Sequence, residues 1–279
     1  MNLKKWFRVT AVLALAAFGL AACGSKSASK DDSKTIRVGI MTKSEADEAR
    51  WNKIQELLDK DGIKLEFTEF TDYSQPNKAL AEGEVDINAF QHYNFLNNWN
   101  KENKGDLVAI ADTYIAPIRL YPGKDVKKLE DIKDGAEIAI PNDPTNESRA
   151  LYLLQLAGLI TLDVSGTELA TVVNIKENKK NLKITELEAS QTARSLESVS
   201  AAVINNTFVT EAGIDPETAL YIEERDENSK QWFNILTANK DWEKSPKADA
   251  INKLIKAYHT DDVKKVIDES SKGLELPVW

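Results

Sequence analysis

The 279-residue sequence contains one cysteine, Cys23, and only two histidines, His92 and His259. A histidine-rich zinc site is therefore excluded, and a Ser-His-Asp arrangement has few ways to form. The chain also lacks G-x-G-x-x-G, Walker A, G-x-S-x-G and H-E-x-x-H motifs, which mark nucleotide-binding, hydrolase and metalloprotease sites. The sequence does not exclude an enzyme that uses paired carboxylates. No feature of the sequence points to one, and we expect no catalytic residue, cofactor or metal.

Positive charge is also scarce. The chain has 36 Lys+Arg against 45 Asp+Glu, a formal net charge of −9 at pH 7. Binding to nucleic acid requires a basic surface that neutralises phosphates, so this balance argues against a nucleic-acid partner. No apolar run after the N-terminal one is long enough to span a bilayer. Because a single cysteine cannot form an intrachain disulfide, the fold must depend on its core.

The N-terminus has the organisation of an export signal. Three basic residues are followed by an uncharged apolar run and by small residues just before Cys23. Leu-Ala-Ala-Cys at residues 20–23 resembles a lipobox, in which cleavage precedes the cysteine and its thiol carries diacylglycerol. We predict a signal peptide at residues 1–22, and a lipidated cysteine with a flexible tether at residues 23–34. This places the protein on the extracytoplasmic face of the cell membrane, held by acyl chains such as palmitate. The alternative is an ordinary signal peptide with an incidental cysteine.

The rest of the chain alternates between strand and helix patterns. Residues 36–40 and 64–70 alternate apolar and polar side chains as strands do, and residues 45–60 space their apolar residues as a helix does. A third strand at 85–90 and a helix at 92–102 continue the rhythm, which is typical of parallel α/β folds. Further strands are predicted at 136–141, 182–187, 201–205 and 220–223, and further helices at 144–158, 247–258 and 261–270.

Two extended segments, near residues 112–119 and 233–238, are predicted to cross between two α/β units. We therefore expect an α/β fold of two lobes, with residues 35–116 plus 233–279 in lobe 1 and residues 117–232 in lobe 2. Open α/β sheets bind ligands beyond the carboxyl ends of their strands, so the cleft between the lobes is the expected ligand site. The alternative is one continuous doubly wound domain.

The densest motif is Ile-Pro-Asn-Asp-Pro-Thr-Asn-Glu-Ser-Arg-Ala-Leu at residues 140–151. A strand runs into a turn and then into a helix that Asp143 caps. The N-terminus of a helix favours an anion. Arg149, in the second turn, could hold a carboxylate through two parallel hydrogen bonds. The alternative is a well-capped helix with Arg149 in a surface ion pair.

Two further segments carry candidate residues. Phe90, His92 and Phe95 lie at a junction between a strand and a helix, where aromatic side chains either form the wall of an apolar pocket or pack in the core. Residues 201–206 form a buried strand that ends in amides. Asn205 there either binds a polar group of a ligand or caps a turn.

Taken together, these segments resemble the methionine-binding lipoprotein family (MetQ/NlpA). The resemblance rests on Asn-Asp-Pro-Thr-Asn-x-x-Arg-Ala-Leu at 142–151, Phe-Gln-His at 90–92, Ala-Val-Ile-Asn at 202–205 and Phe-x-Asp-Tyr-x-x-Pro-Asn-x-Ala-Leu at 70–80. It covers essentially the whole mature chain. The family implies a two-lobed fold of the type II periplasmic-binding-protein kind. It also implies that the protein is the substrate-capturing component of an ABC importer for methionine and related compounds.

The resemblance also implies a ligand site. It implies that Arg149 binds the carboxylate of the ligand. The residues that it places around the ligand are Tyr73, Phe90, His92, Phe95, Asn146, Arg149, Asn205 and Asn234. Aromatic rings suit a thioether, which gains roughly 0.3–1.5 kcal/mol against a ring edge. The chain departs from the family pattern at Phe95 and Phe208, where tyrosine is common, and at Ser148, where glycine is usual.

The implied partners are a methionine ligand, an ABC permease and the membrane, with the protein itself a monomer and not an enzyme. The ligand is L-methionine, with D-methionine and methionine-containing dipeptides as further candidates. The alternatives are a surface lipoprotein with a role in adhesion or signalling, a binding protein for a different small amino acid or peptide, and an enzyme acting in the same cleft.

Overall fold

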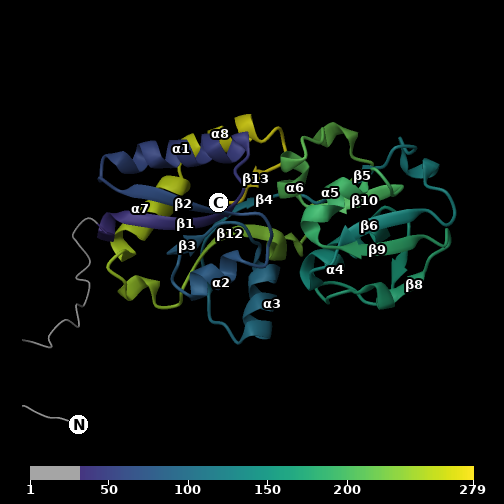
Figure 1. The fold of residues 1–279 in the computed structure, drawn as a ribbon, viewed down its shortest axis with the longest axis horizontal. Coiled ribbons are helices and arrows are strands. Elements are labelled where there is room, and N and C mark those ends of the chain that lie inside the picture. The colour runs from purple at the N-terminus through teal and green to yellow at the C-terminus, as the bar shows by residue number, and fades with distance from the viewer. Residues whose placement is uncertain (1–31) are drawn as a thin grey trace, which may run out of the picture.

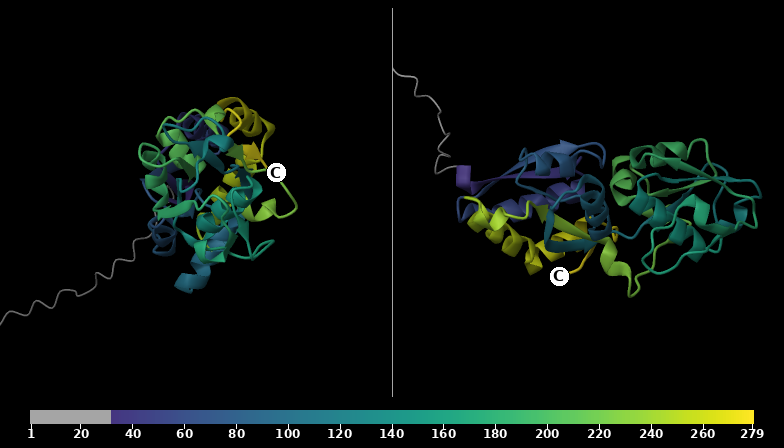
Figure 2. Two further views of the ribbon diagram at one scale, coloured as in Figure 1. Left: turned by 90° about the vertical axis from the view of Figure 1, so that its right-hand side faces the viewer. Right: turned by 90° about the horizontal axis from the view of Figure 1, so that it is seen from below.

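The computed structural model describes residues 32–279. The predicted signal peptide and Cys23 therefore lie outside the described residues. Two sheets lie one after the other along the long axis of the molecule and form two lobes (Figure 1). Figure 2 shows the same separation from below, with the C-terminus in the lobe that holds β1. The prediction of a two-lobed α/β fold is confirmed, and the alternative of one doubly wound domain is wrong.

The first lobe is built on a six-stranded sheet in the order β13-β4-β12-β3-β1-β2. Strand β1 runs parallel to β2 and β3, as predicted. Strand β12 runs antiparallel to β3 and β4, so the returning chain makes the sheet mixed. The strands are β1 (Thr35–Met41), β2 (Lys64–Phe70), β3 (Ile87–Asn88), β4 (Val108–Ile115), β12 (Phe233–Ala238) and β13 (Leu276–Pro277).

Helices cover both faces of this sheet. On one face, Trp51, Ile54 and Leu254 join a core with the strands, and each buried aliphatic side chain contributes roughly 1.5–3 kcal/mol. On the other face, Leu80 and Leu96 pack in a smaller cluster. The first face carries α1 (Glu45–Asp59), α7 (Ala248–Tyr258) and α8 (Asp261–Ser270), and the second carries α2 (Pro76–Ala81) and α3 (Tyr93–Asn103).

The second lobe has a five-stranded sheet in the order β11-β5-β10-β6-β9. Its core packs α4 against β6 and β10. The strands are β5 (Arg119–Pro122), β6 (Glu137–Pro141), β9 (Lys183–Leu187), β10 (Ala201–Ile204) and β11 (Tyr221–Ile222), with a separate pair β7 (Thr161–Leu162) and β8 (Ile175–Glu177). The helices are α4 (Pro144–Leu156), α5 (Thr192–Ser195) and α6 (Asn206–Glu211).

Short 3-10 helices connect these elements. They are η1 (Asp32–Lys34), η2 (Leu129–Asp131), η3 (Val172–Asn174), η4 (Ala189–Gln191), η5 (Pro216–Thr218), η6 (Ser229–Trp232) and η7 (Trp242–Lys244). Among residues 32–279, no helix combines the length and the apolar character that a membrane span needs.

The chain crosses between the lobes twice, and one predicted crossing is misplaced. The first crossing, residues 116–118, lies between β4 and β5 within the predicted segment. The second crossing is the stretch 223–232, which includes η6, because the predicted segment 233–238 is the buried strand β12 of the first sheet. The strands of each sheet fall within the residues expected for each lobe, and the lobe boundaries at 116/117 and 232/233 stay a prediction.

Apolar side chains from both lobes meet between them. Met41 and Phe90 of the first lobe join a cluster with Ile204 and Phe208 of the second. A backbone carbonyl also bridges the lobes, since Arg119 donates to the carbonyl of Gly273 at 3.2 Å. The lobes are therefore in contact around the space that separates the two sheets.

Candidate functional site

The start of α4 points a row of polar side chains toward the first lobe. The Asp143 carboxylate accepts the backbone N–H of Asn146 at 3.0 Å, and Pro144 takes the first helical position, as the sequence predicted. The same carboxylate accepts both contacts from the Asn146 side-chain nitrogen, at 3.1 and 3.0 Å. The amide of Asn146 is thereby fixed with its oxygen facing outward.

Arg149 is buried and paired with an acid, which the sequence did not identify. Its Nε donates to Oε1 of Glu223 at 2.8 Å, and its Nη2 donates both to Glu223 and to the carbonyl of Ala116 at 3.0 Å. The guanidinium also lies over the ring of Trp232, 4.9 Å from its centroid. Only Nη1 has no hydrogen-bond partner within residues 32–279. The predicted alternative of a surface ion pair is wrong because this pair is internal.

Glu223 ties Arg149 to both crossings. Its Oε2 accepts the backbone N–H of Ile118 at 3.2 Å, and its own N–H donates to the carbonyl of Ile118 at 3.0 Å. The pair is internal, with Arg149 4% and Glu223 12% exposed at the side chain. The orientation of Arg149 therefore depends on how the two connecting segments pack.

His92 is the N-cap of α3 and carries a defined tautomer. Its Nδ1 accepts the backbone N–H of Phe95 at 3.1 Å, so the proton must be on Nε2, which lies 3.4 Å from Oδ1 of Asn146. Burial lowers the pKa of His92 to about 3, and the nearby Arg149 adds to this shift. A neutral imidazole therefore joins the first lobe to the second.

His92 makes stability depend on pH. The unfolded chain takes up a proton near pH 6.5 that the folded protein takes up only near pH 3, so this side chain contributes stability that is full above pH 6.5 and is lost as the pH falls toward 3. Urea denaturation at pH 7.5 and 5.0 should show a decrease in unfolding free energy that is about 2 kcal/mol smaller for His92→Gln than for the wild type. Acids with raised pKa values, such as Asp143 and Glu275, act in the opposite sense in both proteins. Equal decreases would contradict this role of His92.

Asn205 turns its side chain into the space between the lobes. It occupies the N-cap position of α6 but makes no capping hydrogen bond, so the predicted alternative of a turn cap does not hold. Its Nδ2 donates to Oδ1 of Asn146 at 2.7 Å. Its Oδ1 is buried without a partner in the described chain. A buried acceptor left unpaired costs about 1–3 kcal/mol, which a ligand donor would recover.

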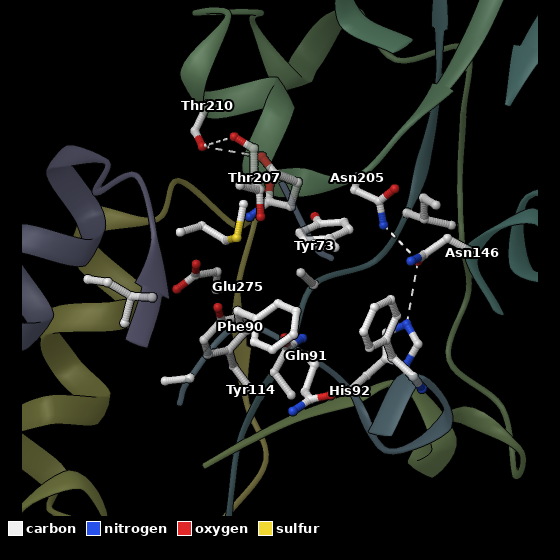
Figure 3. Close-up of a pocket in the computed structure, with 18 of the residues that line it drawn as sticks. Tyr73, Phe90, Gln91, His92, Tyr114, Asn146, Asn205, Thr207, Thr210 and Glu275 are labelled. Atoms are coloured by element: carbon white, nitrogen blue, oxygen red, sulfur yellow. Dashed lines mark hydrogen bonds between the residues drawn. The ribbon is translucent and has the colours of Figure 1, made fainter. Parts of the chain in front are cut away.

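Aromatic rings gather beside these amides (Figure 3). The ring of Tyr73 lies 6.0 Å from Phe90, 6.1 Å from Phe95 and 5.1 Å from Phe208 between centroids. Burial raises the pKa of the Tyr73 hydroxyl above its ordinary value, so the group stays neutral. These rings form a wall that suits an apolar, polarizable side chain.

One cavity between the lobes collects the candidate residues. The cavity has a volume of about 70 Å³, and all eight predicted residues line it: Tyr73, Phe90, His92, Phe95, Asn146, Arg149, Asn205 and Asn234. Asn234 reaches it because it pairs with His92 through an antiparallel bridge at the start of β12. Their contacts with a ligand stay a prediction.

Comparison with known proteins places the chain in a family. The family model described as NlpA lipoprotein matches residues 36–279. The chain belongs to the NlpA lipoprotein family. Within it, the D-methionine-binding lipoprotein MetQ of Escherichia coli K12 is 35% identical over 268 residues, 95% of each chain. The family consists of substrate-binding transport proteins, and MetQ of Escherichia coli K12 is named a lipoprotein.

Solved structures of similar binding proteins have the same fold. The substrate-binding protein of a methionine transporter from Streptococcus pneumoniae is 72% identical, with a TM-score of 0.86 over 88% of this chain and 96% of that chain. A nutrient-binding protein from Burkholderia cenocepacia, solved with methionine bound, is 38% identical, with a TM-score of 0.79 over 88% of this chain and 100% of that chain.

The NlpA resemblance did not identify every residue of the cavity. Its additional polar lining includes Ser44, Asp47, Tyr114, Asn206, Thr207, Thr210 and Glu275. Asp47 had a recognisable signal, because it is the third residue of α1 and forms a capping box with Ser44. Glu275 lies far along the chain in the C-terminal segment, and no pattern connected it to the cleft. Ser148, the departure from glycine, accepts the N–H of Ala170 at 2.9 Å and so serves packing of the second lobe.

Proposed function

We propose that this protein captures methionine outside the cytoplasm and delivers it to an ABC importer. L-methionine is the main ligand, and D-methionine and methionine-containing dipeptides belong to the same class. The two lobes close over the ligand, and its binding favours the closed state over an open one. The protein is a receptor without catalytic activity, and we expect the bound compound to be released unchanged.

The observation that carries this proposal is a complementary pair of unpaired groups in one cavity. Nη1 of Arg149 offers donors with positive charge, and Oδ1 of Asn205 offers a buried acceptor. An α-amino acid presents a carboxylate and an ammonium group next to each other. The first would bind Arg149 and the second Asn205, while the thioether lies against Tyr73 and Phe90.

Calorimetry tests the ligand. Mature protein in detergent, freed of co-purified ligand, is titrated with L-methionine, D-methionine and glycyl-methionine. The expected result is saturable binding of L-methionine at a stoichiometry of one. Mass spectrometry of the compound before and after incubation checks that it is not converted. Absence of heat with all three ligands from a folded protein would remove the proposal.

Cys23 is the proposed anchor. Diacylglycerol on this thiol, with a further acyl chain, adds roughly 0.8 kcal/mol of membrane affinity for each buried CH2 group. Cys23→Ser should therefore move the protein from the membrane fraction of cells to the soluble extracytoplasmic fraction. Fractionation with immunoblotting measures this, with Ser25→Ala two residues away as the matched control. Equal membrane association of the wild type and Cys23→Ser would contradict lipid anchoring through Cys23.

A further inference from the structure

The ligand cavity has a second polar end. Glu275, Tyr114 and Asp47 line it from the first lobe. In Figure 3, Glu275 and Tyr114 lie on the side of the cavity away from Asn146, and Tyr73 lies between this pair and Asn146. This end is separate from the amides that would bind the α-amino and α-carboxylate groups of a ligand. A group bound here would belong to the distal end of a ligand side chain.

Glu275 has an unused oxygen in this wall. The residue is 6% exposed, and its Oε2 accepts a hydrogen bond from Arg50. Its Oε1 accepts none from the described part of the chain. Burial raises the pKa of Glu275 against the opposing effect of Arg50. A carboxylate in a mostly buried residue is costly to keep charged, and a positive group in the cavity would offset that cost.

Carboxylates outnumber guanidinium groups at the second end of the cavity. At the amide end, Arg149 is paired with Glu223, and the Asp143 carboxylate lies behind Asn146, to which it is hydrogen-bonded, and does not line the cavity. At the other end, Arg50 contacts both Asp47 and Glu275, which leaves one negative charge in excess. The Tyr114 hydroxyl beside them makes no hydrogen bond within residues 32–279 and is a further free acceptor. Zwitterionic methionine has no net charge and leaves this excess uncompensated.

We infer that this end of the cavity is a subsite for a positively charged group, so the protein also binds α-amino acids whose side chain ends in a sulfonium or an ammonium. The inference rests on the proposed function, since the α-amino and α-carboxylate groups bind as described there. The faces of Tyr73 and Phe90 attract a cation, and Oε1 of Glu275 supplies the opposite charge. A sulfonium and an ammonium both carry the positive charge that this subsite would attract. They differ in hydrogen bonding, because an ammonium has N–H donors and a sulfonium has none.

Calorimetry with matched ligands tests the subsite. Mature protein in detergent is titrated with L-methionine, S-methyl-L-methionine, L-ornithine and the uncharged L-norleucine. We expect at least one cationic ligand to bind tenfold more tightly than L-norleucine. Glu275→Gln, which keeps the shape and removes the charge, should weaken binding of that ligand at least tenfold. The dissociation constants of L-methionine and L-norleucine should change less than threefold.

The results distinguish which cationic group the subsite prefers from whether the subsite exists. Preference for S-methyl-L-methionine supports attraction by charge and ring faces, and preference for L-ornithine supports hydrogen bonding to Glu275. The inference is overturned when L-methionine binds but neither cation does, or when Glu275→Gln weakens all ligands equally. Failure of L-methionine to bind would instead overturn the proposed function.

A second variant covers the case in which Glu275→Gln does not fold. Tyr114→Phe keeps the ring that lies 4.8 Å from the Arg50 guanidinium and removes only the hydroxyl. It should weaken binding of L-ornithine at least threefold and leave L-methionine unchanged. If the wild type binds L-ornithine in preference to L-norleucine, unchanged binding of both ligands by this variant would also overturn the inference.

Discussion

Replacement of Arg149 by alanine should weaken binding of L-methionine at least 100-fold, about 2.7 kcal/mol. Within residues 32–279, the Nη1 group of Arg149 is the one guanidinium nitrogen in the cavity that no protein group uses. A charge-assisted hydrogen bond to a carboxylate contributes about 1.5–3 kcal/mol, and the buried site excludes competing water. Calorimetry on the variant, with circular dichroism to confirm folding, measures the loss.

A control must separate binding from stability, because Arg149→Ala leaves Glu223 buried without its partner. Breaking such a pair costs roughly 3–5 kcal/mol, whereas replacing both members by apolar residues is often nearly neutral. The double variant Arg149→Met/Glu223→Leu should therefore unfold closer to the wild-type temperature than Arg149→Ala does, with a residual loss from the unpaired Ile118 N–H, and still fail to bind L-methionine. Glu223→Gln keeps the cation and should lose about tenfold or less in affinity. Wild-type affinity in the double variant would refute the role of Arg149.

The contacts of Arg149 narrow the way in which it can hold a carboxylate. The sequence predicts two parallel hydrogen bonds from its guanidinium to the ligand. Nε and Nη2 donate to Glu223 and to the carbonyl of Ala116, so we expect Arg149 to contact a ligand through Nη1. We expect Glu223 to act as a positioning residue that orients the Arg149 guanidinium.

Local signals explain what the sequence predicted well. The start of α4 was predictable because Asp143 and Pro144 are adjacent, and cap chemistry depends only on neighbouring residues. The strand ends that deliver His92 and Asn205 followed from short apolar runs that stop at polar residues. The family resemblance then brought these separate segments to one cleft, which hydrophobic periodicity alone did not specify.

The missed features all depend on contacts between distant parts of the chain. Arg149 and Glu223 are 74 residues apart, and Arg50 and Glu275 are 225 apart. The second crossing was misplaced because an extended pattern at 233–238 fits a crossing and a central strand equally well. Strand β3 is only two residues long although a strand at residues 85–90 was predicted, since its partners β1 and β12 pair with it over Ile87–Asn88 alone.

Replacement of Gly123 by alanine should lower the unfolding temperature by roughly 6–12 °C, from a cost of about 3 kcal/mol. A Cβ atom there would lie 2.0 Å from the carbonyl oxygen of Val199 and 3.1 Å from that of Ser200. The N–H of Gly123 also donates to the Ser200 carbonyl at 2.9 Å, so relief of the clash would stretch this bond. The affected backbone leads directly into β10, the strand that ends at Asn205.

Gly83→Ala is the matched control for this substitution. Gly83 has a φ of +76° and no atom within 4 Å of an added Cβ, so alanine there meets backbone strain without a clash. That strain costs roughly 1–2 kcal/mol, or about 2–8 °C by scanning calorimetry. A larger fall for Gly123→Ala means that close contact between β5 and the segment before β10 holds the second lobe, and with it Asn205, in place. A smaller fall for Gly123→Ala than for Gly83→Ala would mean that residues 199–200 yield without loss, and that the position of Asn205 is set by its hydrogen bond to Asn146 instead.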